Sequence, residues 1–204
     1  VFGRLHVLPA VADFLEAYPD INLRLTLSDR NANLIDDHID VAVRIGTLPD
    51  SALMATTVGS VRRIVCGSPA YFMRHGTPLI PEDLSPLTCV TFDGLAPATA
   101  WDFGLPNKAA SPISIRARLS VNTAEAAIDA AVAGIGVTRI LSYQAAARVA
   151  EGKLRVVLEQ YEPPPLPVSL IHDAQGLMPL KTRAFLDFLA PRLRRALSSS
   201  GAPN

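Results

Sequence analysis

The sequence contains little cysteine, no excess of either charge and no long apolar run. Its only cysteines, Cys66 and Cys89, lie far apart in apolar stretches, which predicts two buried thiols rather than a redox pair. Basic and acidic residues number 19 each, so the chain lacks the basic excess that is typical of nucleic-acid binders. The sequence has neither a membrane-spanning run nor a signal-peptide pattern, so we expect no membrane partner. Buried thiols suit a reducing compartment, and we expect the protein in the cytoplasm.

Motifs for metal binding, nucleotide binding and catalysis are missing as well. The four histidines show no ligand spacing such as HxH or HExxH, and there is no nucleophile elbow, P-loop or dinucleotide fingerprint. We therefore predict no metal, no cofactor and no enzyme activity. With 204 residues, 49% of them hydrophobic, the chain is large enough for one larger domain or two small lobes.

The most informative stretch is LIDDHIDVAVRIGTLPDS at residues 34–51. Side chains over residues 39–45 alternate with the period of a strand, and Gly46 ends it. Asp40, Ala42 and Arg44 alternate with the larger apolar residues and would point to the other face of the sheet. Because Ala42 in this second set is small and apolar, we expect both faces of the sheet to be covered, as in a mostly parallel sheet. Arg44 then lies near the carboxyl end of the strand, where open α/β sheets hold their ligands. The alternative is that Arg44 pairs with a carboxylate at the sheet edge.

Apolar spacing predicts alternating helices and strands, the order that is typical of an α/β fold. Leu8, Val11, Phe14, Leu15 and Tyr18 form the apolar stripe of a first helix. We expect strands over residues 22–28, 53–68 with a break at Gly59–Ser60, 88–92, 101–103 paired with 113–121, 135–140, 154–158 and 168–172. Later helices are expected between Pro69 and Gly76, over 123–133, between Ser142 and Gly152, and over 179–197.

Three of these helices begin at residues suited to capping. Ser68 is a candidate N-cap followed by Pro69 at the first helical position. Asn122 would cap the next helix and form a capping box with Glu125, and Ser142 would cap the third.

The chain crosses twice between two predicted lobes, near residues 61–66 and 160–168. We therefore expect an α/β fold of two Rossmann-like lobes joined by a two-strand hinge. Lobe I would comprise residues 1–62 and 167–197, lobe II residues 63–166, and residues 198–204 a disordered tail. A doubly wound sheet usually starts with a strand and none precedes the first helix, so we expect the first strand to be missing.

The sequence resembles the effector-binding (regulatory) domain of LysR-type transcriptional regulators, in order over residues 2–195. The residues that carry the resemblance are FGRLHVLPAVADFLEAYPDINLRLTLSDR, LIDDHIDVAVRIGTLPDS, VRRIVCGSPAYFMRHGTPLIPEDL and VNTAEAAIDAAVAGIGVTRILSYQAAARVAEGKLRVVL. The resemblance implies the type 2 periplasmic-binding-protein fold and a small-molecule effector in the cleft between the lobes. Family members begin with a winged helix-turn-helix and a linker helix, both expected to be absent here, so DNA would be contacted only through that absent domain.

The resemblance also implies where the effector binds, at loops that follow strands of both lobes. The matching positions are Ser28, Asp29, Arg30, Arg44, Ile45 and Gly46 in one lobe, and Phe92, Asp93, Asn122, Thr123, Thr138, Arg139 and Ile140 in the other. The residues themselves agree in part, since a helix N-terminus at Asn122 and nearby arginines would suit an organic acid. The alternatives are that Asn122 only caps its helix and that Arg139 only pairs with a carboxylate. Trp101 is more readily a packing anchor than part of the cleft wall.

The resemblance further implies a homodimer formed through the regulatory domain. The helix of residues 8–18 and the strand of residues 23–27 would face the helix of residues 143–151 of the mate. Two other functions fit the same fold: a solute-binding protein of a transport system and, with less support, an enzyme with an acid and a base in the cleft.

Overall fold

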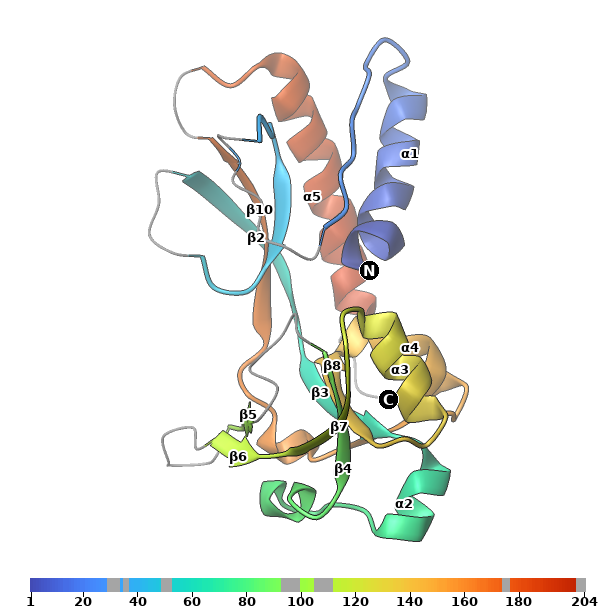
Figure 1. The fold of residues 1–204 in the computed structure, drawn as a ribbon. Coiled ribbons are helices and arrows are strands. Elements are labelled where there is room, and N and C mark those ends of the chain that lie inside the picture. The colour runs from blue at the N-terminus through green and yellow to red at the C-terminus, as the bar shows by residue number, and fades with distance from the viewer. Residues whose placement is uncertain are drawn as a thin grey trace. The chain divides into compact units, whose positions relative to one another are not determined.

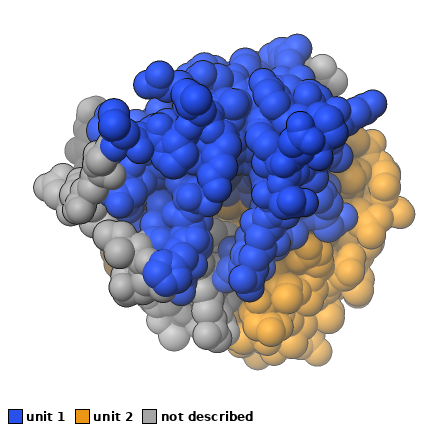
Figure 2. All heavy atoms as spheres, turned by 90° about the horizontal axis from the view of Figure 1, so that it is seen from above, with its two compact units in different colours: residues 1–61, 166–204 blue, residues 62–165 orange. Residues whose placement is uncertain are grey.

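The computed structural model describes residues 1–28, 34, 37–48, 53–92, 100–104, 112–173 and 177–200, with the side chains of 199 and 200 left aside. These residues form an α/β fold with five α-helices and ten strands (Figure 1). The chain divides into two compact units, coloured separately in Figure 2. Unit 1 consists of residues 1–61 and 166–204, and unit 2 of residues 62–165.

Two helices pack side by side in unit 1 (Figure 1). A π-helical turn, Gly3–Val7, leads into α1, Leu8–Ala17, and the last helix is α5, Leu180–Ser200. Phe14 of α1 is 1% exposed and meets Phe185 and Phe188 of α5 edge-on, at ring distances of 5.1 and 5.3 Å. Such edge-to-face pairs are favourable for aromatic rings. Leu8 and Tyr18 of the predicted stripe are exposed, so that part of the prediction is wrong.

The sheet of unit 1 is antiparallel in its described part, contrary to the prediction of a mostly parallel sheet. Its strands are β1 (Ala42–Ile45), β2 (Leu53–Val61) and β10 (Leu166–Asp173), in the order β1-β10-β2. The reason is that β10 enters between the other two in the opposite direction and pairs with both. Its side chains Val168, Leu170 and Ile171 are at most 1% exposed.

Two predictions about strands of unit 1 are wrong. The strand predicted over residues 22–28 is not formed, since this segment pairs with none of the described strands. The long run of residues 53–68 breaks at Arg62, where the chain passes into unit 2, and not at Gly59–Ser60. Gly59 instead pairs with Val168 next to a register shift, since the following residue of β10, Ser169, pairs with Thr57 and leaves Val58 between them. The expected loss of the first strand stays a prediction.

Unit 2 is built on a mixed sheet with the strand order β7-β4-β8-β3-β9. β4 runs parallel to β7 and β8, whereas β3 runs antiparallel to β8 and β9. The strands are β3 (Arg63–Gly67), β4 (Thr88–Phe92), β7 (Arg116–Val121), β8 (Val137–Leu141) and β9 (Arg155–Val157). A separate hairpin joins β5 (Ala100–Asp102) to β6 (Pro112–Ser114), and Ile115 separates β6 from β7.

Each face of this sheet has its own core. Helices α3 (Ala124–Val132) and α4 (Ser142–Ala150) cover one face, where Ile128 and Ala145 pack with Ile64, Cys66 and Ile140. On the other face, the hairpin and the helix α2 (Pro69–His75) cover a second cluster. That cluster includes Val65, Tyr71, Phe72, Cys89, Trp101, Phe103 and Val137. Short 3₁₀ turns, Pro81–Leu84 and Glu159–Tyr161, complete the unit.

The predicted buried thiols are confirmed. Cys66 and Cys89 are both fully buried and free. Burial raises the pKa of each thiol to about 12, so both are protonated at neutral pH.

The predicted helix ends are right for α2 and differ by one to three residues elsewhere. Ser68 caps α2, since its Oγ accepts a hydrogen bond from the Tyr71 amide. α4 begins at Ser142, and Leu141 occupies the N-cap position. The side chain of Gln144 reaches back to this position, where its Oε1 accepts a hydrogen bond from the Leu141 amide at 2.8 Å. α5 continues to Ser200, so the tail predicted from residue 198 is wrong at its start, and residues 201–204 lie outside the described part.

The AGIGV stretch before β8 has a steric explanation. Gly134 has φ +75°, a left-handed conformation that favours glycine. Gly136 lies so close to β4 that a Cβ atom would be 2.3 Å from the Thr88 carbonyl oxygen. Since that neighbour is backbone, it cannot move aside without disturbing the β4–β8 pairing.

We predict that Gly136→Ala lowers the free energy of unfolding by about 2 kcal/mol, because the added methyl group overpacks the sheet. Gly152→Ala is the control, since Gly152 has φ +68° but open space around it. The control should cost about 1 kcal/mol from backbone strain alone. Urea unfolding measures both, and equal losses would contradict the steric explanation.

Candidate functional site

In unit 1, the predicted site residues near Arg44 lie where β1 ends. β1 stops at Ile45, and Gly46 follows with φ +112°, its amide donating to the Pro167 carbonyl at 2.9 Å. Arg44 lies opposite Ser169 of β10 in the ladder and is half-buried, as are all four residues of β1. The prediction that Arg44 stands at the carboxyl end of a strand is confirmed.

The other predicted residues of unit 1 are less well defined. Ser28 is exposed at the end of the segment that belongs to no strand. Asp29 and Arg30, together with Asp93 of unit 2, lie outside the described residues.

In unit 2, several predicted residues lie at one edge of the sheet. β4, β7 and β8 are parallel, so their carboxyl ends meet at the same edge. Phe92 is the last residue of β4, 8% exposed, and pairs in register with Val121 at the end of β7. Asn122 and Thr123 follow directly, and so lie next to Phe92 at this edge.

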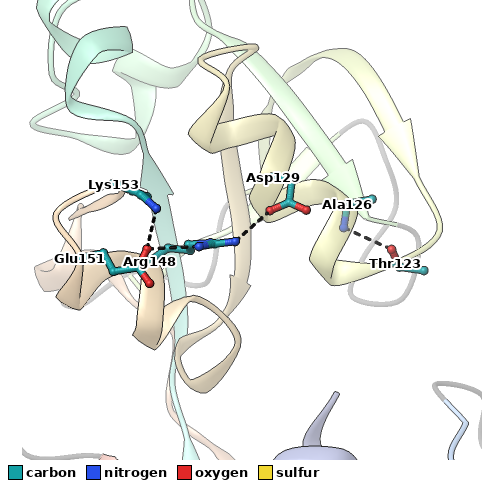
Figure 3. A network of polar contacts seen from close by, with 6 residues as sticks. All are labelled: Thr123, Ala126, Asp129, Arg148, Glu151 and Lys153. Carbon is teal, nitrogen blue, oxygen red and sulfur yellow. Dashed lines mark hydrogen bonds and ion pairs between the residues drawn. The ribbon is translucent and has the colours of Figure 1, made fainter.

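The residue that caps α3 is Thr123 and not Asn122. Thr123 has an extended backbone, and its Oγ1 accepts a hydrogen bond from the Ala126 amide at 3.2 Å (Figure 3). Asn122 is exposed and lies one residue before the cap. Both residue types favour caps, which is why the sequence pointed to the wrong neighbour.

A network of ion pairs connects α3 and α4 (Figure 3). Arg148 of α4 lies 3.6 Å from Asp129 of α3 and 3.1 Å from Glu151, which also pairs with Lys153 at 2.9 Å. All four side chains are well exposed, so this network is a solvated surface feature with little effect on stability.

Thr138 and Ile140 are enclosed in unit 2. Both are 0% exposed, and Ile140 belongs to the core under α3 and α4. The hydroxyl of Thr138 donates to the Val90 carbonyl at 3.0 Å and so links β8 to β4. Contact of either residue with an effector stays a prediction.

Arg139 points to the opposite face of the sheet from Thr138. It is 4% exposed, and one terminal nitrogen donates to the Asp102 carbonyl oxygen of β5 at 2.8 Å. Its guanidinium lies over the Trp101 ring, 5.4 Å from the centroid. Burial lowers the pKa of Arg139 to about 10, helped by the nearby Arg63 and opposed by Asp102. The described hydrogen-bond acceptor is a neutral carbonyl, and the alternative that Arg139 pairs with a carboxylate stays a prediction.

Trp101 is a packing anchor, as predicted. It is 4% exposed and belongs to the core cluster with Phe103. Arg63, which lies on the same face as Arg139, was missed as a site residue. The sequence held a signal for it, since Arg63 occupies an inward position between Val61 and Val65 in an otherwise apolar alternation.

Neither a metal site nor a membrane span is found in the part of the chain that the structure describes. The described residues contain no group of three or more histidines, cysteines or acidic residues that could hold a metal ion. Among the same residues, no helix combines the length and the apolar character needed to cross a membrane.

Comparison with known proteins finds a family model that covers nearly the whole chain. The model, described as the LysR substrate binding domain, matches residues 1–194. The HTH-type transcriptional regulator CrgA of Neisseria meningitidis serogroup B is 32% identical over 191 residues, which cover 93% of this chain and 63% of that protein. The probable HTH-type transcriptional regulator LtrA of Klebsiella pneumoniae is 29% identical over 205 residues, or 98% of this chain and 66% of that protein.

A solved structure agrees with the sequence relatives. The regulatory domain of CrgA from Neisseria meningitidis matches with a TM-score of 0.78 at 29% identity, over 94% of both chains. The chain therefore spans less than two thirds of the length of the two curated relatives but nearly all of a regulatory domain.

The cap assignment gives a direct test of this edge of unit 2. Thr123→Ala should lower the free energy of unfolding by about 1 kcal/mol, because the first turn of α3 loses a hydrogen-bond acceptor. Asn122→Ala is the neighbouring control and should cost less than about 0.5 kcal/mol. Denaturant unfolding of both variants decides the point, and a larger loss in Asn122→Ala would mean that the cap is misassigned.

Proposed function

The chain belongs to the LysR substrate-binding domain family, and on this basis we propose that it is the ligand-sensing regulatory domain of a LysR-type transcription regulator. The observation that carries the proposal is the match of the family model over residues 1–194. DNA would be bound by a helix-turn-helix domain outside this chain, and the protein would act in the cytoplasm, where its DNA target is. The relatives reported above are transcriptional regulators, so a transport protein or an enzyme is not favoured.

The effector is proposed to bind between two lobes joined by a two-strand hinge. Lobe I would comprise residues 1–62 and 167–197, and lobe II residues 63–166. The division into two compact units, with chain crossings after residues 61 and 165, supports these bounds. An effector that prefers one hinge state would shift the population of lobe arrangements and so signal to the DNA-binding domain.

Both lobes are proposed to contribute contacts, and the effector is proposed to be an organic acid. Arg44 supports this from unit 1, since it is half-buried and lies one residue before the end of β1. In unit 2, the edge with Phe92 and Thr123 and the buried cation Arg139 support it. The candidate contacts are Ser28, Asp29, Arg30, Arg44, Ile45, Gly46, Phe92, Asn122, Thr123, Thr138, Arg139 and Ile140.

The site is tested by a thermal-shift screen against aromatic and aliphatic acids. An acid that binds only the folded state raises the melting temperature. Arg44→Ala should reduce that rise without changing the melting temperature of the unliganded domain. Arg195→Ala, an exposed arginine on α5, serves as the matched control. An unchanged ligand response in Arg44→Ala would remove Arg44 from the site, and turnover of a screened acid would contradict a purely regulatory role.

We also propose a homodimer in which α1 and residues 23–27 of one chain face α4 of the other. The exposed apolar side chains Leu5, Leu8 and Leu27, between 41% and 52% exposed, support an interface on this part of unit 1.

Sedimentation velocity should find a dimer at micromolar concentration, and Leu8→Glu should shift it toward monomer because a charge would be buried in the interface. Leu79→Glu is the control, since Leu79 is exposed and belongs to none of the segments proposed for the interface. A parent domain that is monomeric at micromolar concentration, or equal dissociation of the dimer in both variants, would contradict this arrangement.

A further inference from the structure

Two arginines on one face of unit 2 form no ion pair with any residue that the structure describes. Arg139 is 4% exposed, and Arg63 is half-buried. One terminal nitrogen of Arg139 and the Nε of Arg63 are each shielded from solvent and make no hydrogen bond. None of the ion pairs between described residues includes either arginine.

The pairing of β3 with β8 brings the two guanidiniums together. Val65 lies opposite Arg139, and Arg63 lies opposite Leu141 in the antiparallel ladder. Residues opposite each other share a face, so Arg63 and Arg139 are diagonal neighbours on the same face, with Cβ atoms roughly 7 Å apart. The hairpin β5–β6 covers this face and supplies Trp101 and Asp102.

The two arginines share one carboxylate among the described residues. Asp102 acts electrostatically on both, but it meets Arg139 only through its carbonyl oxygen. Glu162 and Glu159 lie 3.5 and 3.4 Å from a third arginine, Arg62. Neither of these two carboxylates forms an ion pair with Arg63 or Arg139, so the free N–H groups of the two arginines have no carboxylate acceptor among the described residues.

A buried guanidinium with an unmade N–H bond is costly. Arg139 keeps its proton and its charge at neutral pH, since its pKa stays near 10 despite its burial and the nearby Arg63. Free N–H groups in a shielded place add a further penalty, because each has lost its bond to water. An anion that accepts from both guanidiniums would remove both costs at once.

We propose that Arg63 and Arg139 form a carboxylate-binding site on this face of unit 2, beside the ring of Trp101. A carboxylate has two acceptor oxygens, which match the two unmade N–H bonds, and its negative charge suits the paired guanidiniums. The inference rests on the proposed function for the role of the ligand, in that this site would hold the acid group of the effector. The anion site itself is tested separately from that role.

Trp101 is the only tryptophan of the chain, so its fluorescence reports on this site alone. We expect acetate and cyclohexanecarboxylate, titrated at constant ionic strength, to change the emission of Trp101 in a saturable way, whereas chloride does not. In Arg63→Met the apparent affinity should fall about tenfold or more, because a charge-assisted hydrogen bond is lost. Arg139→Lys, which keeps the charge but loses the planar fork, should also weaken binding.

Arg148→Met is the matched control, because Arg148 belongs to the exposed network on α4 and should bind like the parent domain. Circular dichroism confirms that each variant folds, and Arg63→Met keeps the test valid if the more buried Arg139 variant unfolds. No saturable change in the parent with either carboxylate, or parent-like affinity in Arg63→Met, would overturn the site.

The test separates this inference from the proposed function. A screened acid that raises the melting temperature equally in the parent and in Arg63→Met would support ligand sensing and overturn the Arg63–Arg139 site. Saturable carboxylate binding at Trp101, together with a screen in which no metabolite acid stabilises the domain, would support the site and count against its role in sensing.

Discussion

Unit 2 depends on the position of β8 between β4 and β3. All five residues of β8 are buried, and the strand bonds to a parallel neighbour on one side and an antiparallel neighbour on the other. The close approach of Gly136 to the Thr88 carbonyl fixes where β8 begins. Because successive side chains point to opposite faces, this one strand sends Thr138 and Ile140 under the helices and Arg139 toward the hairpin. A slip of one residue would exchange those faces and place a guanidinium in the apolar core.

The features that could be predicted from the sequence are those that depend on local order. The helix after Ser68, the end of β1 at Gly46 and the buried position of Trp101 follow from spacing, backbone preference and size, and the structure agrees. Features that depend on a distant partner could not be predicted. Residues 22–28 have the alternation of a strand, but alternation does not reveal whether another strand lies alongside. Likewise, the direction of β10 relative to β1 is a property of the whole chain path.

The candidate site shows the same division. Arg44 was found because a glycine marks the strand end next to it. Arg63 was missed because its importance comes from Arg139, which lies 76 positions later in the printed sequence but on the neighbouring strand. The acceptor for Arg139 is a backbone carbonyl on a hairpin. Every residue has such a carbonyl, so residue types alone do not predict this partner. Motif reasoning therefore locates strand ends well and buried cation pairs poorly.

The two enclosed thiols have a practical consequence for measuring motion. Cys66 and Cys89 are buried and protonated, so maleimide reagents at neutral pH would find no accessible thiolate on the native fold. Cysteines introduced at exposed positions, one in each unit, would then be the reactive ones in an otherwise unaltered chain. Spin labels or fluorophores attached there could report distances between the units with and without a bound acid.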